Sequence, residues 1–238
     1  MEQKRVEDEE YSTMLSRWRF NRPNQQDVVA LNSQVLSVVK TKPQPSTLFA
    51  FSENKDREAL NEFAFETIAK HLEIPEAAYT AWEDYGMLSI VMTVDLKESA
   101  GDYTPNQKAS VKAYIRNSPE RKLGMMAGYL NIIIGGRGMI NENFLTEKGI
   151  SNGTEAIFAE VVLKENATIF PKKLPSCHIV VPAVMSGDVE CITMKHTLPY
   201  FRDLQIDPTL PAGYFSVHPT TFGRKIKLKK TLIDCRIV

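Results

Sequence analysis

Three lysines near the C-terminus, Lys225, Lys227 and Lys229, alternate with Ile226 and Leu228. Residues two apart on a β-strand point to the same face, so this spacing aligns three ammonium groups above an apolar underside. A row of ammonium groups can neutralise nucleic-acid phosphates and release their counterions. The pattern is also typical of a solvated edge strand, where lysine prevents edge-to-edge aggregation. The residues alone leave both interpretations open.

The sequence does not indicate a glycine-rich phosphate-binding loop. The segment GGRG at 135–138 is followed by no Lys-Ser/Thr pair, and it lies between predicted strands, not before a helix. A phosphate-binding loop requires both that pair and that helix. We therefore predict a tight bend with Arg137 exposed, and no ATP chemistry by this chain alone.

Metal and nucleophile patterns are weak. Cys177 and His178 are adjacent, and neighbouring side chains on a strand point to opposite faces, so they cannot bind one ion together. Cys191 and His196 have a loose spacing and no second pair. We predict no catalytic residue, no metal ligand and no cofactor-binding residue.

The segment EKGISNGTEAIF, residues 147–158, predicts a tight turn between two apolar segments. Gly153 adopts positive φ without a steric penalty, and Asn152 tolerates it. The pattern explains a turn geometry and by itself indicates no catalysis.

Composition bounds the class of protein. The chain has 238 residues, of which 43% are hydrophobic, enough for one large domain or two small ones. Lys and Arg number 29, as do Asp and Glu, so the whole chain is not an obvious polyanion binder. Three cysteines give no disulfide framework, no apolar run approaches the ~20 residues of a membrane span, and the charged N-terminus lacks a signal-peptide core. We expect an intracellular protein, nuclear or cytoplasmic, with no membrane partner.

Helical and extended patterns alternate in the first half. Asn24 with Asp27 predicts a helix cap, and Thr104 with Gln107 predicts another. An apolar strand at 47–51 precedes a helix, and 88–97 predicts a second strand. The helix that follows the strand at 47–51 carries Leu60, Phe63, Ala64 and Ile68 on one apolar face. Such a succession of strand and helix favours an α/β sheet.

After Gly128 the pattern becomes a series of short β-type runs separated by Gly, Pro and Asn. This spacing favours a small antiparallel barrel or sheet. The runs are YLNIII, GMINENF, EAIFAEVVL, ATIF, CHIVVPAV, GYFSVH and FGRKIKLKK.

Several segments, in order, resemble the PIF-type (petite integration frequency) DNA helicases of superfamily one. LSRWRFNRPNQQDVVALNSQVL is similar to the stretch that closes the family's first RecA-like domain. LFAFSENKDREALNEFAF resembles the strand and helix that open its second RecA-like domain, with matches at Asn54 and Asn61. In the family this helix start approaches single-stranded DNA.

The most specific resemblance runs from Ser118 to Val162 and marks the family's β-barrel insertion. The matching residues are Lys122, Gly128, Leu130, Gly136, Asn143, Gly149, Asn152, Gly153 and Thr154. Arg137 and Gly138 replace an expected Met and Pro, and Ala156 replaces a Gly. The family's phosphate loop, magnesium-holding acids and arginine finger have no counterpart in the sequence.

The resemblance implies an α/β fold: a partial RecA-like parallel sheet with an inserted small antiparallel β-barrel. It implies three parts: 1–42, the end of the first RecA-like domain; 43–127, part of the second; and 128–238, the barrel insertion and return strands. LPSCHIVV and FSVHPTTFGRKIKLKK look like strands that lead back into the RecA-like sheet.

The implied function is that of a fragment of an ATP-dependent helicase, a family that unwinds duplex DNA in repair and telomere maintenance. The family uses ATP and Mg²⁺ through a domain with no counterpart here, so we expect at most weak single-stranded DNA binding and pairing with a separate ATPase domain. A decayed structural or interaction protein without DNA affinity is the alternative. The candidate DNA-binding residues are Asn54, Lys55, Arg57, Arg137, Asn152, Thr154, Lys225, Lys227 and Lys229.

Overall fold

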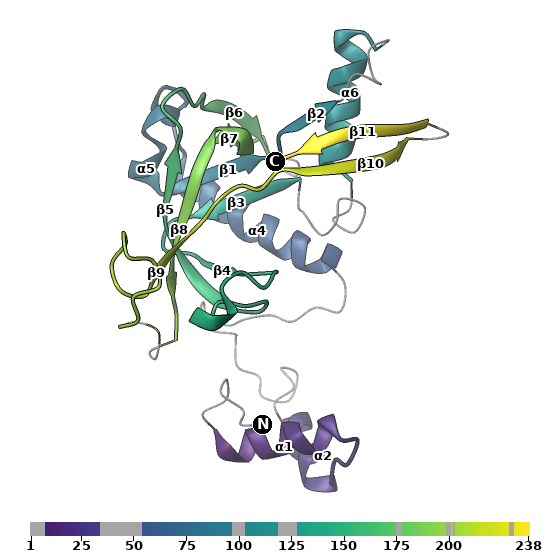
Figure 1. The fold of residues 1–238 in the computed structure, drawn as a ribbon, viewed down its shortest axis with the longest axis vertical. Helices are drawn as coiled ribbons and strands as arrows, with labels where there is room; N and C mark the ends of the chain where they lie inside the picture. The colour runs from purple at the N-terminus through teal and green to yellow at the C-terminus, as the bar shows by residue number, and fades with distance from the viewer. Residues whose placement is uncertain are drawn as a thin grey trace. The chain divides into compact units, whose positions relative to one another are not determined.

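A computed structural model describes residues 8–33, 54–96, 103–118, 128–174, 178–198, 201, 203–228 and 231–238 (Figure 1). The chain divides into two units, Met1–Ala50 and Phe51–Val238, which are described separately below. The strand predicted at 47–51 lies outside the described residues. The three domain boundaries implied by the resemblance remain predictions.

The first unit contains two helices, α1 (Glu9–Arg19) and α2 (Gln25–Ser33). The predicted cap of α2 is confirmed, because the Asp27 amide donates to Asn24 Oδ1 at 2.8 Å and the Asn24 amide donates to Asp27 Oδ2 at 3.0 Å. Arg17 Nε also donates to Asp27 Oδ2 at 2.8 Å, and this hydrogen bond is the main cause that lowers the pKa of the buried Asp27 to about 2. The contact ties α1 to the start of α2.

The second unit begins with α4 (Asn54–Leu72), and the apolar face predicted from the sequence is not the face that the structure buries. Phe65 and Ala69 are 2% exposed, whereas Phe63 is 66% exposed. Residues 65 and 69 lie four apart on one face and pack against Met87 of the mixed sheet described below. The helix carries two apolar stripes, and the tertiary contact selects the one that the sequence pattern did not indicate.

Shorter helical segments connect the strands. The predicted cap of α6 is confirmed, since Thr104 and Gln107 form a reciprocal capping box there. The remaining helical elements are η1 (Glu76–Ala81), α5 (Trp82–Tyr85), α6 (Pro105–Arg116), η4 (Thr146–Lys148) and η5 (Ser186–Asp188). None of the helices in the described part of the chain combines the length and hydrophobicity of a membrane-spanning segment.

One sheet, called the mixed sheet, has the strand order β3-β1-β7-β6. β1 runs parallel to β7 and antiparallel to β3, and β6 runs antiparallel to β7. The α/β class is therefore confirmed, but the predicted parallel sheet is wrong for the described strands apart from the β1–β7 pair. The strands are β1 (Met87–Val91), β3 (Tyr129–Ile133), β6 (Phe170–Lys173) and β7 (Val180–Met185).

A second sheet, called the antiparallel sheet, has the strand order β4-β5-β8-β9. Its antiparallel character is as predicted, but among the described strand pairs it stays open and β4 does not pair with β9. No sequence pattern had indicated β8. The strands are β4 (Arg137–Met139), β5 (Glu155–Leu163), β8 (Val189–His196) and β9 (Tyr214–Val217).

The third sheet, called the small sheet, has the order β10-β11-β2 and is antiparallel. The strand predicted at 88–97 divides at residues 92–93, so its first part is β1 and its second part joins this sheet. Ile115 of α6 packs against Cys235 and Ile237 of the small sheet. The strands are β2 (Val94–Leu96), β10 (Phe222–Leu228) and β11 (Thr231–Ile237).

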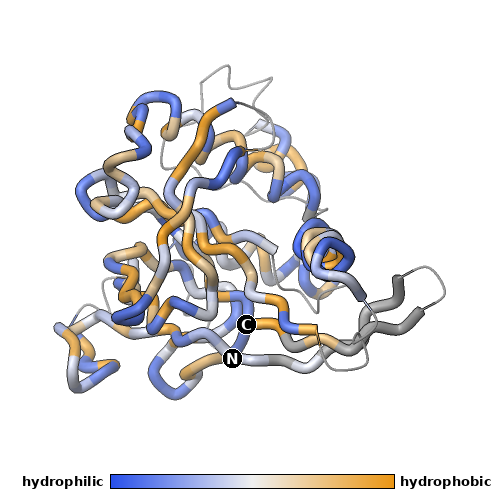
Figure 2. Tube along the Cα trace, turned by 90° about the horizontal axis from the view of Figure 1, so that it is seen from above, coloured by the Kyte–Doolittle hydropathy of each residue, from blue (hydrophilic) through white to orange (hydrophobic). Residues whose placement is uncertain are grey.

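The mixed and antiparallel sheets share a core. Leu88, Ile132 and Val184 of the mixed sheet pack with Val161 and Val189 of the antiparallel sheet. Figure 2 shows apolar segments along the central strands and polar segments on outer turns and helices. Burial of large aliphatic side chains, worth about 1.5–3 kcal/mol each, therefore fixes the antiparallel sheet on the mixed one.

Candidate nucleic-acid interface

The turn predicted at Asn152-Gly153 is present and is held by its own backbone. Gly153 has a φ of 86°, its amide donates to the Ile140 carbonyl at 2.7 Å, and the Ile140 amide donates to the Thr154 carbonyl at 2.9 Å. The Thr154 hydroxyl accepts from the Ser151 amide at 2.9 Å. Because Thr154 is only 7% exposed, the structure gives its side chain a bracing role, while Asn152 stays exposed.

The bend predicted at 135–138 is also present, and Arg137 follows it as the first residue of β4. Gly135 has a φ of 81°, which favours glycine, and no helix follows the bend. The Arg137 side chain is 47% exposed, and its Nη1 lies 2.7 Å from Glu155 Oε1. The predicted exposed arginine is confirmed, and it has an acidic partner on the neighbouring strand.

Strand register places Arg137 in a row that crosses the antiparallel sheet. Arg137 pairs with Ile157, Ile157 pairs with Lys195, and Lys195 pairs with Tyr214. The row therefore takes one residue from each of the four strands, and directly paired side chains lie about 5 Å apart. We call these four residues the transverse row.

The transverse row faces away from the core. The adjacent residues Ala156, Met194 and Phe215 are buried, and successive side chains on a strand point to opposite faces. Lys195 Nζ lies 5.4 Å from the centroid of the Tyr214 ring, within the range of a cation–π contact. Two cations and an aromatic ring on an open sheet are the groups that contact phosphates and stack on bases in single-stranded nucleic acid.

Two carboxylates limit the positive charge of this face. Glu155 pairs with Arg137, and Glu160, beyond a β-bulge on the same strand, is exposed. The face thus carries as many acids as bases among these residues. Any attraction for a polyanion is consequently modest and screened by salt.

The other predicted residues are not gathered at this row. Lys55 is exposed and Arg57 half-buried in the first turn of α4, where the side chain of Asn54 lies outside the described set. Lys225 and Lys227 occupy β10 at register positions opposite Asp234 and Leu232. Lys229 lies outside the described residues, and Figure 1 shows β10 in a different part of the unit from β4.

Sequence reasoning missed Lys195 and Tyr214. Tyr214 was within the predicted strand GYFSVH, so alternation with the inward Phe215 could have marked it as an outward aromatic residue. Lys195 lies in β8, which, like β11, was not among the predicted strands. Register between distant strands is the feature that joins both residues to Arg137.

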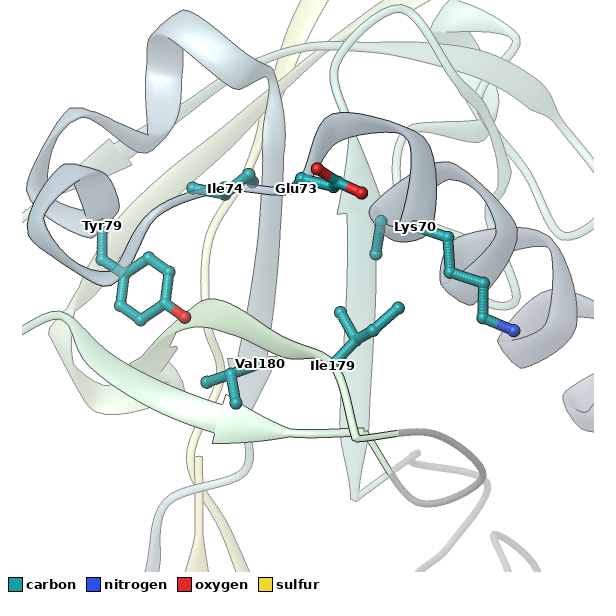
Figure 3. A pocket seen from close by; sticks show the side chains of 7 residues that line it. Lys70, Glu73, Ile74, Tyr79, Ile179 and Val180 are labelled. Carbon is teal, nitrogen blue, oxygen red and sulfur yellow. The ribbon is translucent and has the colours of Figure 1, made fainter.

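A hollow of about 470 Å³ lies at the C-terminal end of α4 (Figure 3). Its lining is mainly apolar; Tyr79 directs its hydroxyl toward Val180, while the Lys70 ammonium points away. Desolvation raises the pKa of the Tyr79 phenol. The residues that line the hollow are Ala69, Lys70, Glu73, Ile74, Tyr79, Ile179 and Val180.

Within the described residues no group of three His, Cys, Asp or Glu side chains is arranged to hold a metal ion.

Comparison with protein-family models, with curated proteins and with solved structures gives no match to this chain.

Proposed function

We propose that the unit at 51–238 is a weak single-stranded-DNA-binding module that derives from a PIF-type helicase. In this proposal it corresponds to part of a second RecA-like domain with its β-barrel insertion. The observation that carries the binding proposal is the transverse row, with Arg137, Lys195 and Tyr214 on one outward face. Phosphate contacts by the two cations and base stacking on the ring supply the affinity.

The arrangement of strands supports the proposed ancestry. LPSCHIVV was expected to lead back into the RecA-like sheet; its last two residues begin β7, which pairs in parallel with β1. The Asn152-Gly153 turn, the most specific part of the resemblance, connects β4 and β5 of the antiparallel sheet. β4 and β5 precede β7 in the chain, and β8 and β9, which complete the antiparallel sheet, follow it.

The test is titration of a labelled oligothymidylate by fluorescence anisotropy at about 50 and about 200 mM salt. We expect weak binding that decreases steeply with salt. The Arg137→Ala/Lys195→Ala double variant should bind about tenfold less tightly at low salt, and its salt slope should fall by about 1.4, because two phosphate contacts are lost.

A matched control removes two exposed lysines away from the row, Lys70→Ala and Lys173→Ala. This control changes the net charge equally, so equal losses in both double variants would contradict a specific role of the row. ATP and Mg²⁺ belong, in the proposal, to a separate ATPase domain. We accordingly expect no single-stranded-DNA-dependent ATP turnover by the purified chain, and measurable turnover would overturn this part.

The alternative function is that of a decayed interaction protein without DNA affinity. The apolar side chains on the outward stripe of α4 favour it, since Phe63 is 66% and Ile68 36% exposed. Exposed apolar side chains of this kind are typical of contact surfaces for other proteins. Absence of oligonucleotide binding at about 50 mM salt would support this function over DNA binding.

A further inference from the structure

A buried polar cluster lies on the mixed sheet, apart from the transverse row. Lys172 Nζ of β6 donates to Ser89 Oγ of β1 at 2.9 Å, and Ser89 Oγ donates to Asn131 Oδ1 of β3 at 2.7 Å. Ser89 is fully buried and Lys172 is half-buried. The chain of hydrogen bonds therefore runs from a half-buried lysine on an outer strand to the interior of the sheet.

The surroundings of the Lys172 amine are neutral at contact distance. Its Nζ lies 4.0 Å from the centroid of the Tyr129 ring and hydrogen-bonds to a hydroxyl. Among the described residues, no carboxylate lies within ion-pair distance of it. Glu62 of α4 favours the charged form from farther away, and Glu66 of the same helix is buried with an interaction of its own.

Burial without an ionic partner favours the neutral amine. Desolvation is the largest effect and lowers the pKa of Lys172 to about 8, against the opposing influence of Glu62. At pH 7.5 an amine with a pKa near 8 is about one quarter neutral, whereas an ordinary lysine is about 0.1% neutral. Only the neutral amine has a lone pair with which to attack an electrophile.

The geometry also decides which group of the cluster can react. The hydroxyl of Ser89 has no exposed surface, so a substrate cannot reach it as a nucleophile. The Lys172 side chain is half-buried, and Ser89 and Tyr129 hold its Nζ in place. Of the groups in the cluster, the amine is therefore the one that a small electrophile is expected to reach.

We propose that Lys172 is a covalent modification site for small aldehydes. The neutral Nζ attacks the carbonyl carbon to form a carbinolamine, in which the nitrogen loses a proton and the oxygen gains one. Loss of water then gives an imine between Nζ and the former carbonyl carbon. The step consumes no oxidant or reductant and is independent of DNA binding by the transverse row.

The experiment is reductive methylation of the folded wild-type chain with limiting formaldehyde and cyanoborohydride, followed by peptide mass spectrometry. Lys173, adjacent on β6 and exposed, is the internal control. At pH 7.5 we expect the labelled fraction of Lys172 to exceed that of Lys173 by on the order of tenfold, because its larger neutral fraction outweighs reduced access. The rate at Lys172 should level off above about pH 8.

Denaturation supplies the second measurement. In strong guanidinium chloride both lysines should label at equal rates, since the difference depends on burial. Lys172→Arg should abolish the preferred label without altering that of Lys173. Equal or slower labelling of Lys172 than of Lys173 in the folded chain, or a rate at Lys172 that keeps rising beyond pH 9, would overturn the proposal.

Discussion

Lys195 and Lys172 each lie over a tyrosine ring, Lys195 on the outer face of the antiparallel sheet and Lys172 on the mixed sheet beneath α4. The distances from Nζ to the ring centroid are 5.4 Å for Lys195 with Tyr214 and 4.0 Å for Lys172 with Tyr129. Only Lys172 also donates to a fully buried hydroxyl, that of Ser89.

The two lysines are both half-buried, so the difference between them lies in what each ammonium contacts. On the outer face, Lys195 contributes charge to the row proposed to contact phosphates. Beneath α4, Lys172 donates to the buried Ser89 hydroxyl, and desolvation lowers its pKa to about 8, which supports the proposed reaction of its amine with aldehydes. The surroundings of the amine therefore distinguish two lysines that each lie near a tyrosine.

The largest expected difference between the buried cluster on the mixed sheet and the outer face of the antiparallel sheet is in the free energy of unfolding. Ser89→Ala removes the acceptor of Lys172 and the donor to Asn131, so it should lower the free energy of unfolding by about 2 kcal/mol. Ser216→Ala on the antiparallel sheet should change it by less than about 0.5 kcal/mol. Urea unfolding of both variants measures the contrast, and equal losses would mean that the buried cluster is not a connected network.

The two tyrosines should differ in DNA binding. Tyr214→Ala is expected to weaken oligothymidylate binding about fivefold without changing the salt slope, because base stacking is lost and phosphate contacts are kept. Tyr129→Ala should leave the affinity unchanged. Anisotropy titrations test this, and a similar loss in both variants would remove the distinction between the regions.

We expect the stability of the fold to depend on pH through His196, which lies beneath the transverse row. His196 is 2% exposed, its Nδ1 accepts from the Leu198 amide at 3.1 Å, and burial lowers its pKa despite the nearby Gly149 carbonyl. Below about pH 6.5 the unfolded chain binds a proton that the folded chain excludes, so stability falls as pH falls toward the lower folded pKa.

The wild-type chain should therefore have a lower melting temperature at pH 5 than at pH 7.5. In His196→Gln this difference in melting temperature should be smaller by about 3 °C. His218→Gln is the control, because His218 is exposed at the end of β9 on the same sheet. A difference that shrinks equally in both variants would assign the pH dependence elsewhere.

The smallest effect concerns the acid beside Arg137. Glu155→Gln should tighten oligonucleotide binding about twofold at low salt, since it removes a negative charge and releases the guanidinium for phosphate. Glu165→Gln, at an exposed turn, serves as the charge-matched control. Weaker binding in Glu155→Gln would show that the carboxylate positions Arg137 instead of competing for it.

Local elements were predictable wherever a few neighbouring residues decide the backbone. The caps at Asn24 and Thr104 and the turn at Asn152-Gly153 have the expected hydrogen bonds. β5 spans EAIFAEVVL as expected, because a run of β-prone residues favours one conformation. β8 was missed, since Glu190, Lys195 and His196 interrupt its apolar pattern.

The sequence by itself determined these caps, turns and most strands, together with the exposed Arg137, because each depends on residues within a few positions. Only the tertiary structure decided which stripe of α4 is buried, which strand lies beside β1, and that Arg137, Lys195 and Tyr214 share one face. It also brought Lys172 to Ser89, which is 83 positions away. Such contacts depend on strand register and on burial over the whole core, and no local pattern encodes them.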